Sequence, residues 1–341
     1  MAYFKEPLHN ANDITVTDVK FTAGDINISF HRFDAKEAQE CPKQLRPSSG
    51  DYYAGTTIHD VVVYKDAIHI FGGDDYYNHL AYREDEIGRG YEYYNDIPYP
   101  FIHSKAVAAG NELYLIGLSG AHGQNTVYGN VLLYNDESDS FSLYYNYNKS
   151  LEYADAYPLF DDTFFKVYRI YIFGGLETPT TAQGILAKSK GFVSPVSIPL
   201  SFNNEYSHAV VFNDHLHIFA WDSTNNIMLH YYHEDPEPGG ASFIAKNSFS
   251  VDKISNVIAV YGKLYAFTYH SGIYVWNEDD DTWSLLDNTV TNSAYFYPRS
   301  VVLYKNKVHV FNWAPNRPSS YRAYHTKLSS LYTIGLGEQN D

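Results

Sequence analysis

One six-residue pattern recurs along the chain at a nearly constant spacing. Each copy alternates apolar and ring-bearing residues over its first positions, which is typical of a half-buried strand. The copies are IHIFGG at 68, LYLIGL at 113, IYIFGG at 170, LHIFAW at 216, LYAFTY at 264 and VHVFNW at 308. The five steps from the first start to the last average 48 residues. A period of this length indicates one supersecondary unit repeated six times.

The residues that flank the copies repeat as well. An apolar strand precedes most of them, at VVVY (61–64), AVAA (106–109), AVVF (209–212), VIAV (257–260) and VVLY (301–304). Gly, Asn and Asp in the short joining turns supply the φ values that a tight hairpin needs. After two copies, VLLYNDESDSFSL (131–143) and IYVWNEDDDTWSLL (273–286) match each other across an acidic turn, and AYHTKLSSLYTI (323–334) keeps their seven-residue spacing. The unit therefore has four strands.

This order of elements resembles the kelch repeat: strand, turn, LY[VI]FGG, loop, V-x-x-Y-[DN], acidic turn, [WF]-x-x-L. The resemblance covers about residues 55 to 336, although FFKVYR (164–169) is a poor first strand and no clear outer pair follows Tyr82. It implies an all-β fold, a six-bladed kelch-like β-propeller closed around a central channel. Closure agrees with the physics, because one blade cannot bury both faces of its own sheet.

Six ring-bearing residues occupy the second position of the motif. We expect them to pack one blade against the next and to satisfy their polar tips locally, rather than to converge on a metal. They are His69, Tyr114, Tyr171, His217, Tyr265 and His309.

Residues 1–50 lie outside the clean repeat, which begins in the segment 51–341. ITVTDVKFTAGDINISFHRF (14–33) predicts an N-terminal β-hairpin, and residues 34–51 have no strand pattern and are predicted to be a linker. The hairpin either pairs with a sheet edge or serves as an attachment segment for an assembly partner. DINISF also loosely resembles a further copy starting at Ile26, so seven blades is the alternative.

Composition excludes several classes of partner. The net charge of −16 and the absence of a basic cluster argue against nucleic acid. No apolar run is long enough for membrane insertion, and the N-terminus lacks the apolar core of a secretion signal. Cys41 is the single cysteine, so no internal disulfide forms. We expect a chain that is cytoplasmic when made, or one that is then incorporated into a virion.

The copies differ most in the loops that follow the motif strand and in the connections between blades, which we expect at 83–100, 144–158 and 287–298. These loops are rich in Tyr, Asn, Ser, Gly and Asp, a mixture that suits recognition of a protein or a surface glycan. At the last motif position, three consecutive copies replace glycine by Trp221, Tyr269 and Trp313. Such rings either plug the channel or form a recognition platform. The predicted ligand-binding residues are Trp221, Asp222, Asn225, Tyr269, His270, Trp313, Asn316 and Arg317.

Catalytic signals are weak. No phosphate-binding loop, metal-binding helix or nucleophile elbow is present, so we predict no catalytic residues, no metal site and no cofactor. Asp279, Asp280 and Asp281 are expected to form a solvated turn. The sequence therefore favours a non-catalytic recognition module. The alternatives are a virion surface or tail component that binds a host receptor and docks through residues 1–50, and a kelch-type enzyme, an oxidase or sugar epimerase.

Overall fold

A computed structural model of the 341-residue chain provides the fold. The residues that it describes are 26–40, 58–72, 78–84, 90–98, 101–119, 128–147, 149–151, 154–161, 167–175, 177–186, 192–202, 206–213, 215–233, 243–251, 253–260, 262–269, 272–286, 300–311 and 324–336. They form strands, turns and loops, with no helix among them. Within these ranges nothing helical is therefore long and apolar enough to cross a membrane.

The strands form six four-stranded antiparallel sheets, which confirms the six-bladed β-propeller. The first blade contains β2 (Ile58–Tyr64), β3 (Ala67–Gly72), β4 (Asn78–Tyr82) and β5 (Tyr91–Tyr93), and the second β6 (Phe101–Ala109), β7 (Glu112–Ser119), β8 (Tyr128–Asn135) and β9 (Ser140–Tyr147). The third contains β10 (Asp155–Asp161), β11 (Val167–Phe173), β12 (Thr181–Leu186) and β13 (Phe192–Ser197).

The second half of the ring repeats this order. The fourth blade contains β14 (His208–Phe212), β15 (His215–Asp222), β16 (Ile227–His233) and β17 (Ile244–Phe249), and the fifth β18 (Ile254–Val260), β19 (Lys263–Thr268), β20 (Ile273–Asn277) and β21 (Thr282–Leu285). The sixth contains β22 (Ser300–Tyr304), β23 (Lys307–Phe311), β24 (Tyr324–Leu336) and, from the start of the chain, β1 (Ile26–Glu40).

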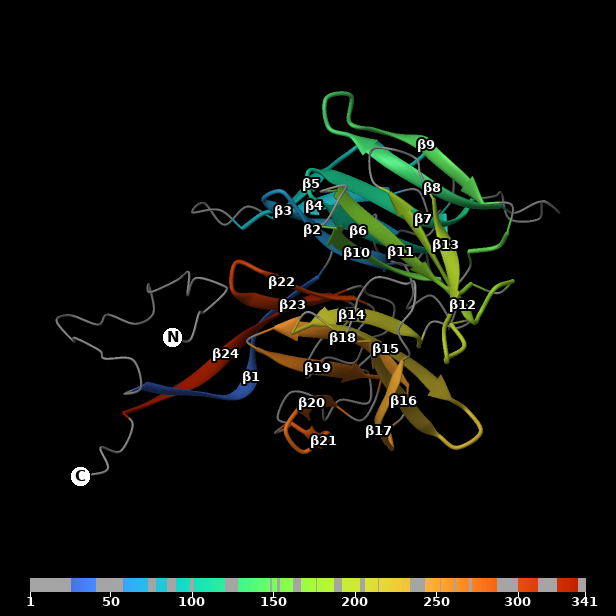
Figure 1. The fold of residues 1–341 in the computed structure, drawn as a ribbon. Coiled ribbons are helices and arrows are strands. Elements are labelled where there is room, and N and C mark those ends of the chain that lie inside the picture. Colours follow the sequence, from blue (N-terminus) through green and yellow to red (C-terminus); the bar gives the residue numbers. More distant parts are fainter. Residues whose placement is uncertain are drawn as a thin grey trace.

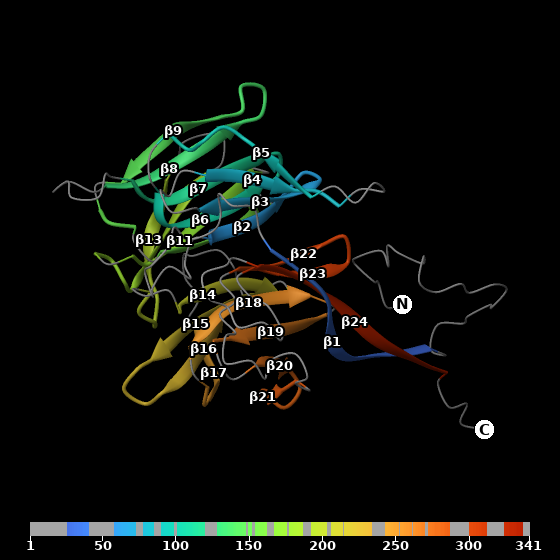
Figure 2. The ribbon, with the colours of Figure 1, turned by 180° about the vertical axis from the view of Figure 1, so that it is seen from behind.

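The sixth blade closes the ring with strands from both ends of the chain. β1 pairs antiparallel with β24 from Ile26 opposite Leu336 to Glu40 opposite Tyr324. Figures 1 and 2 show the blue β1 beside the red β24 from opposite sides. The first strands of successive blades are neighbours around the whole circle, including β22 and β2. Pairing the two chain ends in one sheet ties the last blade to the first part of the chain.

This closure corrects two predictions about the termini. Residues 34–40, expected in the linker, belong to β1, and Ile26–Phe30 lies in the sixth blade rather than in a seventh. Residues 324–336 form one strand, although 323–334 keeps the seven-residue spacing of the two-strand segments 131–143 and 273–286. The sequence offered two roles for the N-terminal segment, pairing with a sheet edge or attachment to a partner. β1 pairs with the edge strand β24. The first strand of the expected hairpin lies outside the described residues. The pairing joins residues about 300 positions apart, so local patterns do not reveal it.

Two tyrosine-rich connections were also misassigned. The expected first inter-blade loop, 83–100, contains β5, and the expected loop 144–158 contains the end of β9 and the start of β10. Tyr144 and Tyr147 are 7% and 6% exposed, so they pack inside the fold. Strand preference for aromatic residues explains these tyrosines, and they are not displayed on a loop.

The hydrophobic core is divided among the blade interfaces. Each of six buried clusters combines side chains of two successive blades, as when Tyr304 and Phe311 of the sixth blade pack with Ile68 and Ile70 of the first. The six ring-bearing residues at the second motif position are all buried, at 3% exposed or less. This burial agrees with the packing role expected for them.

Acidic turns add a repeated polar contact between blades. Asn95, at the end of the first blade, donates from its backbone N–H to Asp139 Oδ2 of the second, at 2.9 Å, and from Nδ2 to the Asp139 carbonyl. Asn247 of the fourth blade binds Asp281 of the fifth in the same way, at 3.0 and 2.9 Å. Asp281 Oδ1 also accepts the Trp276 Nε1–H. Asp281 is therefore a structural acceptor, more than a solvated turn residue.

Candidate ligand-binding face

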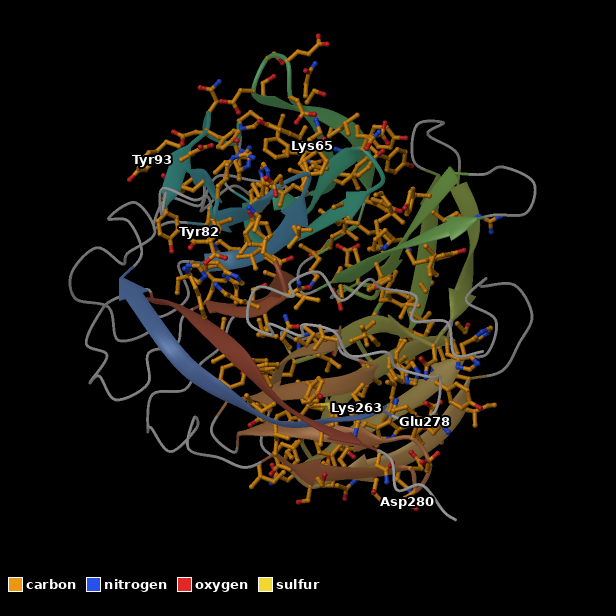
Figure 3. The ribbon with its side chains drawn as sticks, turned by 90° about the vertical axis from the view of Figure 1, so that its left-hand side faces the viewer. Lys65, Tyr82, Tyr93, Lys263, Glu278 and Asp280 are labelled. Atoms are coloured by element: carbon orange, nitrogen blue, oxygen red, sulfur yellow. The ribbon has the colours of Figure 1, made fainter. Side chains whose placement is uncertain are left out.

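The two connections that leave the second strand and the fourth strand of every blade share one end of the propeller, because the strands alternate in direction. The first-to-second and third-to-fourth turns share the other end. Figure 3 labels residues at this other end, among them Lys65 and Lys263 at first-to-second turns and Glu278 in a third-to-fourth turn. We call the end that carries the other connections the loop face.

Trp221 and Tyr269 reach the loop face at the ends of β15 and β19, as the sequence predicted. The structure connects them through Tyr206, which precedes β14. The Tyr206 ring meets Trp221 edge to face at 5.8 Å between centroids, and it meets Tyr269 at 5.4 Å. The tyrosine thus joins the two predicted rings into one aromatic group across the fourth and fifth blades.

A lysine completes this group. Lys253 Nζ lies 4.5 Å from the Tyr206 ring centroid and 5.2 Å from that of Trp221, and it donates to the Tyr206 hydroxyl at 3.0 Å. The Lys253 carbonyl accepts the Tyr269 backbone N–H at 2.9 Å, which fixes the segment that carries the lysine. We call Tyr206, Trp221, Lys253 and Tyr269 the aromatic–lysine cluster.

The rings of the cluster differ in exposure. Tyr269 is 8% exposed, so it packs against Tyr206 and offers a ligand little surface. Trp221 is half-buried and packs against the hydrophobic cluster between the fourth and fifth blades. Its Nε1–H is buried and finds no acceptor among the described residues. The surface that this cluster can offer therefore comes from Trp221, Tyr206 and Lys253.

Asp222 and Asn225 serve the turn between β15 and β16. Asp222 Oδ1 accepts the backbone N–H of Thr224 at 2.9 Å, and its Oδ2 accepts the Asn225 amide at 2.7 Å. The Asn225 amide and these backbone donors hold the pKa of Asp222 below its usual value. The side chains of Asp222 and Asn225 thus already form hydrogen bonds within the turn. His270, Trp313, Asn316 and Arg317 lie outside the described residues.

Sequence reasoning missed Tyr206 and Lys253. Each stands in a connection just before the first strand of a blade, two residues before β14 and one before β18. The motif alignment started at the second strand and gave these positions no signal. A search for aromatic and basic residues directly before each first strand would have found both.

A second polar group lines the innermost strands. In every blade the third motif residue pairs with a first-strand residue, and the position before that partner is polar. These six residues are Asp60, Lys105, Asp155, His208, Asn256 and Ser300. All but Lys105 are 8% exposed or less. We call them the inner polar ring.

The inner polar ring links neighbouring blades. Asp60 Oδ2 accepts the Ala106 backbone N–H of the next blade at 2.8 Å, and Asp155 Oδ2 accepts that of Ala209 at 2.6 Å. At the closing interface, Ser300 Oγ donates to Asp60 Oδ1 at 2.9 Å. The buried carboxylates thus accept hydrogen bonds from backbone N–H groups of the next blade. This joining of neighbouring blades explains why the inner polar ring is buried.

Lys105 lies between the two carboxylates of the ring. Its Nζ is 3.7 Å from Asp60 Oδ2 and 3.2 Å from Asp155 Oδ1. Burial favours the neutral amine, but Asp155 and Asp60 outweigh it and raise the pKa of Lys105 above its usual value. Burial also raises the pKa of Asp60, against the opposing effect of Lys105. Among the described residues no three His, Cys, Asp or Glu side chains gather as a metal site.

No family model matches the chain, and no curated protein matches its sequence. Among solved structures, an oligogalacturonate lyase in complex with manganese is similar at a TM-score of 0.48 and 10% identity, over 77% of this chain and 74% of that one. The sheet topology of the chain itself defines its class, the six-bladed β-propeller.

Proposed function

We propose that this propeller is a non-catalytic, kelch-like recognition module that binds a glycan or a protein through its loop face. The observation that carries the proposal is the aromatic–lysine cluster. Tyr206, Trp221 and Lys253 come from two blades, and rigid strands fix them at the end where the variable connections lie. Binding residues are commonly held in this way on connections of a rigid scaffold.

The chemistry of the cluster suits both ligand types. Aromatic faces stack on apolar ligand surfaces, and the lysine ammonium donates to hydroxyl or carboxylate oxygens. A host-surface receptor is one such ligand, so a virion surface or tail component that binds a receptor is the alternative proposal. Of residues 1–50, proposed to dock such a particle, 26–40 form the outer strand of the sixth blade. Docking is therefore proposed for the rest of that segment.

The test is to replace Trp221 by Ala and Lys253 by Ala, and to measure binding to a glycan and host-surface panel together with melting. Stacking on one ring is worth about 1–3 kcal/mol in nucleic-acid complexes. Assuming a comparable value here, Trp221→Ala should weaken ligand binding about 5- to 160-fold, and Lys253→Ala should weaken it by removing the ammonium donor. Lys246→Ala is the matched control, because Lys246 Nζ also lies over two rings, Tyr232 and Trp276, but on the outer strand β17. Lost stability with unchanged affinity would refute the proposal.

A further inference from the structure

Three blades contain a pair of hydrogen-bonded histidines in their buried centres. One member stands on the second strand of the blade and the other on the third. The pairs are His69 with His79, His217 with His230, and His309 with His325, at Nδ1···Nε2 distances of 2.8, 2.8 and 2.7 Å. All six side chains are 3% exposed or less. Each contact requires one nitrogen to donate and the other to accept, so at least one ring of each pair is neutral.

Each pair lies against the next blade. The third-strand histidine stacks on a phenylalanine of its own blade, as His79 does on Phe71 at 4.7 Å between centroids. The same histidine also contacts an aromatic ring of the following blade. His79 contacts Tyr134, at 5.2 Å between centroids. Trp276 has the same place beside His230, at 5.2 Å, and Tyr82 beside His325, at 4.6 Å.

The third pair stands at the seam of the ring. His325 Nδ1 also forms a hydrogen bond with the Tyr91 hydroxyl of the first blade, at 3.1 Å. Figure 3 labels Tyr82 in the first blade, whose ring meets His325 of β24. This seam joins the sixth blade, which is made from both ends of the chain, to the first blade.

The other three blades follow a different rule at the same two positions. They place tyrosine at the second-strand site, at Tyr114, Tyr171 and Tyr265. The register puts an apolar residue at the third-strand site, at Val131, Ala182 and Ile273. Histidine thus occurs with histidine and tyrosine with an aliphatic residue. Both combinations fill one packing site, but only the first contains side chains that take up protons near neutral pH when they are exposed to water.

Burial is the main electrostatic influence on these histidines. It lowers the pKa of His69 to about 4 and that of His79 to about 2, and it lowers the pKa of His217 and of His309 to about 3. His230 and His325 are lowered well below the usual value for the same reason. The charged or titratable groups that face the pairs are Arg83, Lys65, Asp136 and Asp139 at the first, His215 and Lys246 at the second, and Glu84, Lys307 and Lys327 at the third.

We propose that the three histidine pairs make this propeller acid-labile, so that mild acid opens the interfaces of blades 6 and 1, 1 and 2, and 4 and 5 before the other three. A second proton on a pair places two like charges in contact in a dry interface beside aromatic rings. The three tyrosine interfaces acquire no such charge. The seam that closes the ring is among those that open.

The sign of the effect follows from linkage. A histidine that stays neutral when folded but titrates near pH 6.5 when unfolded gives full stability above that pH, and stability falls as the pH drops toward the folded pKa. Between pH 7.5 and 5.0 each such histidine raises the unfolding equilibrium constant about 30-fold, and a pair about 1,000-fold. Near pH 5 one pair therefore adds about two protons to the slope of log K against pH.

The experiment converts one blade type into the other. His69→Tyr with His79→Val copies the second blade, His217→Tyr with His230→Val repeats the test at the second pair, and His309→Tyr with His325→Ile repeats it at the seam. Urea unfolding from pH 7.5 to 5.0 should show each double variant losing one to two protons of slope. A variant that folds at pH 7.5 and keeps the native slope overturns the proposal, and three independent pairs guard against a single misfolded variant.

Two further measurements address location. Tyr265→His with Ile273→His places a pair in the fifth blade and should increase the slope. Amide-exchange protection factors at pH 7.5 and 5.5 should fall more in β3, β15 and β23 than in β7, β11 and β19. An equal fall in all six strands would overturn the assignment to three interfaces.

Discussion

The lysine of the inner polar ring provides the sharpest test of how the blades are joined. In Lys105→Met, two buried carboxylates, Asp60 and Asp155, lose the cation that they share, which lies 3.7 and 3.2 Å from their oxygens. Removing one partner of a buried ion pair costs about 3–5 kcal/mol, because it leaves an uncompensated charge. Both carboxylates keep their backbone N–H donors, so we expect a loss near the lower end of that range.

The assay is urea unfolding followed by tryptophan fluorescence, with Lys65→Met as the matched control. Lys65 also binds one carboxylate, Asp136, at 2.8 Å, but the two side chains are 52% and 41% exposed. Exposed pairs contribute about 0–1 kcal/mol, so this variant should remain close to the parent. Equal losses for the two variants would refute the blade-joining role assigned to Lys105.

The pH dependence of the Lys105→Met loss has a defined sign. Burial already raises the pKa of Asp60, and Lys105 is the largest of the influences that oppose it, so the variant carboxyl is protonated at higher pH. A protonated carboxyl needs no cation. The difference between variant and parent should therefore be largest at pH 7.5 and shrink on acidification. Adding Asp60→Asn and Asp155→Asn removes both charges and should restore most of the stability.

Two other predictions concern backbone space and blade clasps. Gly174→Ala should destabilise the third blade strongly, because the φ of Gly174 is +75° and an added Cβ would come within 2.2 Å of the Phe202 Cβ. Gly90→Ala is the control, because an added Cβ there has nothing within 4 Å, and it should be nearly neutral. The melting temperatures of the two variants test this difference. Asn247→Ala should cost about 0.5–1.5 kcal/mol in urea unfolding, because it removes an exposed hydrogen bond from the Asn247 amide group to the Asp281 carbonyl. A loss below the error of the measurement would show that this contact contributes nothing.

From the sequence alone, six blades and the strands at their centres were predictable, with seven blades as the alternative. The motif at six places fixed β3, β7, β11, β15, β19 and β23, because alternation and turn residues are local properties that neighbouring residues display. It also placed Trp221 and Tyr269 at one end of their strands and predicted burial for His69 and its equivalents, which the structure confirms.

Only the tertiary structure decided what those residues touch. The pairing of β1 with β24 joins the chain ends, the inner polar ring joins five blades, and Tyr206 reaches Trp221 from a separate connection. The second histidine of each pair stands 10 to 16 residues after the first, a spacing set by loops of different length. Such contacts depend on register and on closure of the ring, which no single segment encodes, because the energy that selects them arises only when the blades pack together.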